Sequence, residues 1–210
     1  MKIHIVGIAG VAGAGKDLLY SLVSKNANCA RFSLADALKE ECKDFCLENF
    51  GVDPTNCSRE AKNKIRPFLV GYGLTKRNVT EGRYWIDKLT PKIKNFIFEQ
   101  AINADSQAKE LFIFITDIRY SKYDKDEVYW LKKEMKGKLI HLSRFDTKPN
   151  SIERIFIEAA NEEEQNQNPL LLEHSDLSIE WQTAYGTKIE VENSLNPAAI
   201  GLLKDLKNIS

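Results

Sequence analysis

The chain has 210 residues, 43% of them hydrophobic, which suits one α/β domain with a real core and argues against a second independent domain. Its 30 basic and 30 acidic residues give a formal charge of zero, so no global field favours nucleic acid or an anionic membrane. The apolar runs are far shorter than a membrane span, and no signal-peptide pattern is present, so we expect a cytoplasmic protein. The four cysteines lack zinc-site spacing and favour reduced, packed thiols.

Hydrophobic periodicity predicts alternating strands and helices along the chain. In chain order it predicts a strand at 2–8, a helix at 15–25, a strand at 29–35, helices at 35–50, 58–69 and 85–104, a strand at 110–119, a helix at 127–135 and a strand at 137–144. Then follow a helix at 151–160, a flexible polar turn at 162–169, a strand at 187–193 and a helix at 197–206. Strands separated by helices predict a mostly parallel sheet covered on both faces, with ligands at the carboxyl ends of the strands.

A glycine-rich loop links the first predicted strand and helix. Gly10, Gly15 and Lys16 match G-x-x-x-x-G-K, in which glycines let backbone N–H groups turn toward a phosphate and the helix presents its positive end. The motif predicts the three-layer fold of phosphate-loop NTPases and an ATP site. We expect the backbone of the intervening Ala12, Gly13 and Ala14 to join that site, with Lys16 acting at the transferred phosphoryl group.

Two acids are candidates for the metal. Asp17 follows the lysine where a serine or threonine is usual, and its carboxylate either reaches Mg²⁺, directly or through water, or only stabilises the helix start. Asp117 and Arg119 end the strand at 110–119. Asp117 either holds Mg²⁺ through water, as a Walker-B acid does, or pairs with Arg119 and directs that arginine toward a phosphate.

A second anion-binding region is predicted at 66–85, where basic and aromatic residues are interleaved. These are Arg66, Lys76, Arg77 and Arg83 with Tyr72, Tyr84 and Trp85. Arginines clamp phosphates and rings stack on bases, although a solvated basic helix face has the same composition. Downstream, Arg144 is a candidate for adenine stacking and Arg154 for closure over the phosphates, or else a helix-surface arginine. His174 either contacts ligand or caps a turn.

With these pieces in order, the sequence resembles the bacteriophage-type deoxynucleoside monophosphate kinases over nearly the whole chain. The matching elements are "GVAGAGKD", "FSLADALKE" for F-A-D-x-L-K, residues 66–85 for R-x-x-L-Q-x-x-G-T-x-x-R…W, "TDIRY" for D-V-R-F, "EHSD" for H-x-S-E, and "IEVENSLNPAAIGLL" for the closing strand and helix. Val70 replaces the glutamine, Leu74 replaces the threonine, and "YSKYDKDE" lacks the usual Asn-Glu. These departures bear on substrate choice.

The resemblance implies transfer of the γ-phosphoryl group of ATP, with Mg²⁺, to a deoxynucleoside 5′-monophosphate. It implies substrate contacts at Asp36, Lys39, Arg66, Leu69, Val70, Gly73, Arg77, Trp85, Asp117 and Arg119. Lys16, Arg119 and Arg154 are then the catalytic cations, and Arg144 belongs to the ATP site. Within a single kinase domain, 1–210, residues 51–104 become the substrate-binding segment and 145–172 the lid. A phage-encoded chain would act in the host cytoplasm.

Two alternative interpretations of the function stay open. The G-K-D loop is also similar to that of the animal-type phosphomevalonate kinases, so the acceptor can be another small phosphorylated molecule. A nucleotide-binding regulatory protein without turnover is the second, although it has no need of Arg66, Arg77 and Arg119 in one small domain. A GTPase is disfavoured because no N-K-x-D motif follows an apolar strand. The expected partners are small nucleotides, with no nucleic acid and no membrane, and the chain is a monomer or homodimer.

Overall fold

The computed structural model describes residues 1–102, 110–148 and 152–209 of the chain. The strands are β1 (Lys2–Ala9), β2 (Cys29–Phe32), β3 (Glu110–Ile115), β4 (Lys138–Thr147), β5 (Arg154–Phe156) and β6 (Leu177–Gln182). The helices are α1 (Lys16–Ser24), α2 (Leu34–Glu41), α3 (Lys43–Phe50), α4 (Arg59–Val79), α5 (Arg83–Ile102), α6 (Glu127–Tyr129), the π-helical turn η1 (Trp130–Glu134), α7 (Glu162–Glu173) and α8 (Lys188–Asn208). In these ranges, no helix combines the length and the apolar character that crossing a membrane requires.

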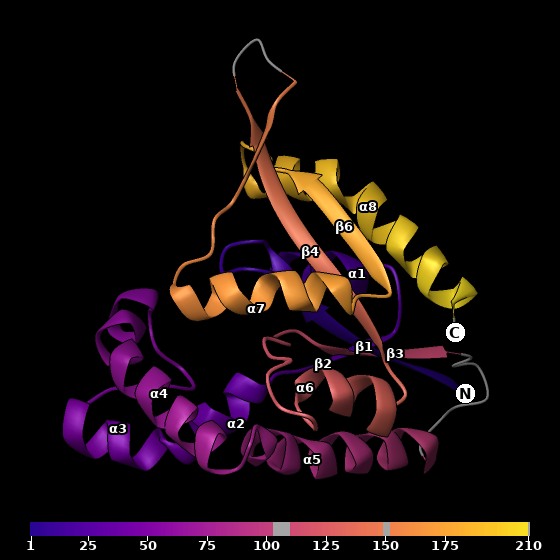
Figure 1. Ribbon diagram of the computed structural model, residues 1–210. Helices are drawn as coiled ribbons and strands as arrows, with labels where there is room; N and C mark the ends of the chain where they lie inside the picture. Colours follow the sequence, from indigo (N-terminus) through magenta and orange to yellow (C-terminus); the bar gives the residue numbers. More distant parts are fainter. Residues whose placement is uncertain (103–109, 149–151, 210) are drawn as a thin grey trace.

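One sheet runs through the molecule, and its parallel strands follow the order β2-β3-β1-β4-β6 (Figure 1). β1 is central, since Val6 pairs with Phe114 of β3 on one side and with Lys138 of β4 on the other. Parallel neighbours need crossover connections, which explains why helices lie between the strands. The predicted mostly parallel sheet is confirmed. Its carboxyl edge gathers the segments that follow β1, β3 and β4.

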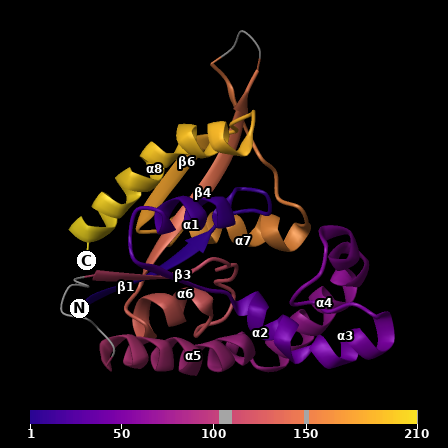
Figure 2. The ribbon, with the colours of Figure 1, turned by 180° about the vertical axis from the view of Figure 1, so that it is seen from behind.

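Successive side chains of each strand point to opposite faces of the sheet, and they pack into two separate hydrophobic cores, one on each face. Val6 and Ile8 of β1 pack with α1 and α8, which lie together on one face (Figure 2). Ile5 packs with α2, α5 and η1 on the opposite face. Each helix layer thus removes its apolar stripe from water by covering the sheet. The predicted three-layer α/β fold is confirmed.

Helices α3 and α4 form an arm at the side of the molecule away from the C-terminus (Figures 1 and 2). The predicted helix at 35–50 is two helices, because α2 ends at its C-cap Cys42 and α3 begins after it. The predicted start at Ser58 is confirmed, since its side chain accepts from the Ala61 N–H. The helix continues beyond Leu69 to Val79 because buried positions continue along the same face.

The predicted helix at 151–160 is wrong where the structure describes it. Residues Arg154–Phe156 form the strand β5, antiparallel to β4 with Phe156 opposite Phe145, and this hairpin projects from the sheet (Figure 1). The phenylalanine rings lie 5.7 Å apart, and such cross-strand pairs stabilise a hairpin. The predicted Pro-Asn turn at 149–150 and Ser151 lie outside the described residues.

Two predictions near the C-terminus are also wrong. The flexible turn expected at 162–169 is the start of α7, because Asn161 caps the helix and three acids in its first turn suit the helix dipole. The strand expected at 187–193 is the start of α8, where Thr187 and Glu190 form a capping box. The last parallel strand is instead β6, which no pattern had indicated.

Candidate active site

The loop between β1 and α1 has the backbone shape that its glycines allow. Gly10 has φ of 133°, and Gly15, the N-cap of α1, has φ of 99°; both values favour glycine. A Cβ on Gly10 would lie 2.2 Å from the Leu142 carbonyl oxygen. A Cβ on Gly15 would lie 2.6 Å from Cζ2 of Trp181. The loop therefore needs both glycines for conformation and for space, and it leads directly into the N-terminus of α1.

Trp181 of β6 supports this loop from the far end of the chain. Its indole Nε1 donates to the Ala14 carbonyl oxygen at 2.9 Å, and the ring is buried against Gly15. The two residues are 167 positions apart, so no local pattern pointed to the contact. The shape of the phosphate loop thus depends on the last strand of the sheet.

Lys16 lies at the first turn of α1 with its ammonium group folded into the loop. Its Nζ donates to the carbonyl oxygens of Gly10, at 2.6 Å, and Val11, at 3.0 Å. Burial first, and then the nearby positive charge of Arg119, lower the pKa of Lys16 to about 8. The amine is thus placed where a phosphate held by the loop would restore its charge.

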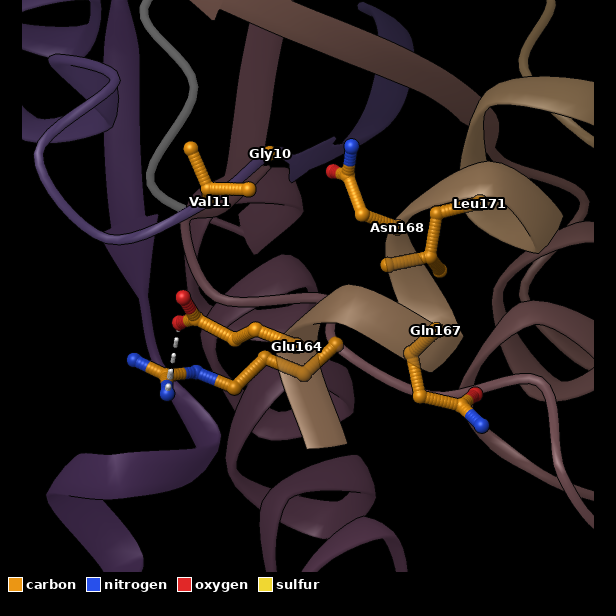
Figure 3. A pocket seen from close by; sticks show the side chains of 7 residues that line it. Gly10, Val11, Glu164, Gln167, Asn168 and Leu171 are labelled. Atoms are coloured by element: carbon orange, nitrogen blue, oxygen red, sulfur yellow. Dashed lines mark ion pairs between the residues drawn. The ribbon is translucent and has the colours of Figure 1, made fainter. Parts of the chain in front are cut away.

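A carboxylate of α7 contacts the same loop (Figure 3). Glu164 accepts from the Ala12 N–H at 3.1 Å, and its other oxygen lies 3.8 Å from Nη1 of Arg119. Gly10, Val11, Gln167, Asn168 and Leu171 line the small pocket beside this ion pair. Arg119, predicted at the phosphates, therefore lies next to the loop, whereas Glu164 was not predicted there.

Asp117 anchors α2 to the end of β3. Its carboxylate is buried and accepts from the Ser33 hydroxyl at 2.8 Å and from the backbone N–H groups of Leu34 and Ala35 at 2.9 and 2.8 Å. This is the capping that a helix N-terminus needs. No ion pair between Asp117 and Arg119 occurs among the described contacts, because Arg119 pairs with Glu164.

Asp17 fits a water-mediated magnesium site better than a closed metal cage. Its side chain is 84% exposed, and its nearest partner is Arg31 at 3.5 Å. Arg31 also pairs with Asp36, which in turn holds Lys39 at 2.6 Å. Within the described ranges, no three acidic, histidine or cysteine side chains cluster as metal ligands. Mg²⁺ bound to a nucleotide needs only one or two carboxylates besides phosphates and water, so the residues present fit it.

A cleft of about 270 Å³ adjoins the loop at the ends of β4 and β6. Arg144 lines it, and its buried Nε has no hydrogen-bond partner within the described ranges. His141 and Asn168 form another wall, joined by a hydrogen bond of 2.9 Å. Arg154 lies on β5, where it is exposed, pairs with Glu180 at 2.6 Å and covers the Phe145 ring. Arg144 thus keeps one unpartnered donor within the described ranges, whereas Arg154 has an internal partner.

The predicted substrate region at 66–85 is spread over α4 and α5. Arg66 and Val70 are exposed on α4, and Leu69 is buried in the arm. Trp85 is buried and donates from Nε1 to the Gly73 carbonyl oxygen at 3.1 Å. Leu69, Gly73 and Trp85 therefore shape the arm from within, and Arg66 is the member of the set that presents charge to solvent.

Arg77 has a different environment from the one predicted. Its side chain is 4% exposed and forms a double hydrogen bond with Asp126, one arm of it 2.8 Å long, while the Tyr120 ring stacks on it at 3.8 Å. Glu127 lies 3.7 Å away, accepts from the Arg119 N–H at 2.6 Å and fixes the loop that carries Arg119. Burial raises the pKa of Glu127 to about 8. We therefore expect Arg77 to act on stability.

No family model and no curated protein matches the chain. Among solved structures, it is similar to a dephospho-CoA kinase from Campylobacter jejuni, with 15% identity, a TM-score of 0.46 and 97% of each chain covered. It is also similar to a shikimate kinase from Acinetobacter baumannii in complex with shikimate, with 12% identity, a TM-score of 0.42 and coverage of 97% and 94%. Structural similarity this remote does not bear on activity. The proposed activity is therefore argued from the site alone.

Three residues with a part in the arrangement were missed from the sequence, namely Glu164 and Trp181 at the loop and Asp126 beside Arg77. Asp126 stands in "YSKYDKDE", the stretch that departs from the expected Asn-Glu, and nothing local in this charged stretch marks it as the partner of a buried arginine. Glu164 is one of three consecutive acids, and only the packing of α7 decides which of them reaches the loop.

ATP binding should weaken above the lowered pKa of Lys16. Below pH 8 the amine is charged, and above it the protein must take up a proton to bind phosphate, so affinity falls as the pH rises. We expect about tenfold weaker binding at pH 9 than at pH 7, as one unit of pKa implies. Calorimetric titration at both pH values measures this. In Lys16→Arg the guanidinium does not titrate and the difference should vanish; equal affinities in the parent would contradict the assignment.

Proposed function

We propose that the chain is an ATP-dependent phosphotransferase that moves the γ-phosphoryl group of ATP to a deoxynucleoside 5′-monophosphate. The observation that carries this proposal is the loop at 10–15, in which three glycines with positive φ lead into α1 and Lys16 stands at the helix start. This arrangement is suited to bind the phosphates of a nucleotide through N–H groups, the helix dipole and a cation.

The donor side of the site supports nucleotide binding in particular. The cleft beside the loop has Arg144 on one wall, and its guanidinium plane suits stacking on a base. Arg119 lies at the other side of the loop, 50% exposed, where a cation stabilises charge on a transferring phosphoryl group. Asp17 would hold Mg²⁺ through water, and the ion would neutralise charge on the phosphate oxygens.

The acceptor side is assigned to the arm of α3 and α4. In the transfer, the bond between the γ-phosphorus and its bridging oxygen breaks, a bond to an acceptor phosphate oxygen forms, and ADP leaves. An acceptor that is itself anionic needs a second cation, which Arg66 supplies from α4. A phosphorylated acceptor without a base would use the same cation. Contacts to the base, rather than the charge, therefore decide between a deoxynucleoside monophosphate and such an acceptor.

A coupled assay of ADP release across an acceptor panel tests the proposal. The panel holds the four deoxynucleoside monophosphates, the matching ribonucleotides and phosphomevalonate. We expect at least one deoxynucleotide to exceed every other acceptor in kcat/KM. Preference for phosphomevalonate would replace the nucleotide acceptor, and ATP binding without turnover on any acceptor would favour a regulatory protein.

Two single variants should distinguish the ATP site from the acceptor site. Arg144→Ala should raise the KM for ATP, and Arg66→Ala should raise the KM for the monophosphate, each by roughly tenfold, because a hydrogen bond to a charged group is worth about 1.5 kcal/mol or more. Steady-state kinetics with each substrate varied in turn gives both constants. Each variant serves as the control for the other; if both raise the same KM, the two sites have been assigned wrongly.

A further inference from the structure

Glu164 makes contacts that a phosphate oxygen would otherwise make. Its Oε2 accepts from the loop N–H of Ala12, and its Oε1 faces the guanidinium of Arg119. The side chain is only 15% exposed, so the carboxylate is held in the site rather than in solvent. Both donors belong to the set that the proposed function assigns to the nucleotide.

We propose that Glu164 is an internal competitor for the phosphate site, so that a nucleotide binds by displacing the first turn of α7 from the loop. The inference rests on the proposed function, since it presumes that the loop binds phosphate. A carboxylate and a phosphate oxygen are both anionic acceptors, and they cannot share one N–H donor at close range without repulsion. Glu164 must therefore leave before the phosphate is fully bound.

The rest of α7 is anchored, which places the moving part at its first turn. Gln167 accepts from the Ser121 N–H at 2.9 Å, Asn168 bonds to His141, and Leu171 is buried in the core. The first turn is held by Glu164 itself, whose Oε2 also accepts from the Ala160 N–H at 3.1 Å. Removal of this carboxylate would free the N–H groups of Ala12 and Ala160, while Ile157 and Ala159 of the linker stay packed on the core.

Competition of this kind lowers the apparent affinity by the fraction of molecules in which the site is open. A substitution that abolishes the charge of Glu164 removes that cost and should tighten nucleotide binding. The direction is the opposite of what a substrate-binding or merely stabilising residue would show, since loss of either would weaken binding or leave it unchanged.

Calorimetric titration with ATP tests the proposal in four proteins, namely the parent, Glu164→Gln, Glu164→Ala and Glu162→Gln. Glutamine keeps the shape of the side chain and removes its charge, while Glu162 is an exposed acid in the same turn and serves as the matched control. We expect both Glu164 variants to bind ATP at least tenfold more tightly than the parent, and Glu162→Gln to stay within twofold of it.

The outcomes separate this inference from the proposed function. Parent-like or weaker ATP binding in both folded Glu164 variants, as judged by thermal melts, would overturn the competition and leave the kinase proposal standing. Absence of ATP binding in all four proteins would overturn both. Hydrogen exchange adds a second readout, since ATP should accelerate exchange of the Ala160 amide in the parent; unchanged or slower exchange there would contradict displacement of the turn.

Discussion

Replacing Lys16 by alanine is expected to lower phosphoryl transfer by about 100-fold or more while the chain stays folded. The ammonium group is folded into the loop, where its Nζ donates to the carbonyl oxygens of Gly10 and Val11. A fixed cation at a transferring phosphoryl group contributes most in the transition state, so kcat should fall more than ATP affinity.

The matched control is Lys25→Ala, at the other end of α1. Lys25 pairs with Glu192 on the surface, so its loss should leave kcat within twofold. Initial rates at saturating ATP, together with a thermal melt of each variant, make the comparison. Activity of Lys16→Ala within threefold of the parent would remove the phosphate-loop assignment.

Replacing Arg77 by alanine is expected to destabilise the fold by about 3 kcal/mol or more, because it leaves the Asp126 carboxylate buried without its partner. That is a large part of the roughly 5–15 kcal/mol that holds a domain together. Urea unfolding followed by circular dichroism gives the difference in the free energy of unfolding between parent and variant.

Two further variants test whether the loss in the free energy of unfolding comes from the unpaired, buried carboxylate of Asp126. Arg66→Ala, exposed on the same helix, should change the free energy of unfolding by no more than about 0.5 kcal/mol. Arg77→Ala combined with Asp126→Asn should recover part of the loss, since the neutral amide removes the unpaired charge and its oxygen still accepts from the surrounding backbone N–H groups. If Arg77→Ala unfolds at the parental urea concentration and instead raises the KM for the acceptor, its predicted substrate role is restored.

The strands of the sheet centre could be predicted because their apolar runs are local signals. β1, β3 and β4 follow from "KIHIV", "LFIFI" and "KLIHL" alone. β6 could not be predicted because its side chains are only partly buried. Residues 187–193 instead predict a strand from sequence, because Ile189 and Val191 alternate with polar residues. The capping box of Thr187 and Glu190 was the available signal for the helix.

The same distinction between local signals and long-range contacts applies to the candidate site. The phosphate loop is encoded within seven consecutive residues, 10–16, so its sequence predicts its glycine conformations and its place before a helix. The partners of its members come from elsewhere: Asp117 caps α2 through residues more than 80 positions away, and Arg77 pairs with Asp126 rather than with a ligand. Charge type alone cannot tell an arginine that faces a substrate from one that neutralises a buried acid.

The central position of β1 also bears on how the chain folds as it is made. β1 precedes both of its sheet neighbours, and its pairing of Val6 with Phe114 and with Lys138 spans 108 and 132 residues. At roughly 5–20 residues per second, a ribosome takes on the order of ten seconds to supply those partners. Throughout that interval β1 is part of a nascent chain and has neither of its neighbouring strands to pair with. The rate of translation, as much as the finished fold, thus sets how long this strand is exposed to chaperones and to aggregation.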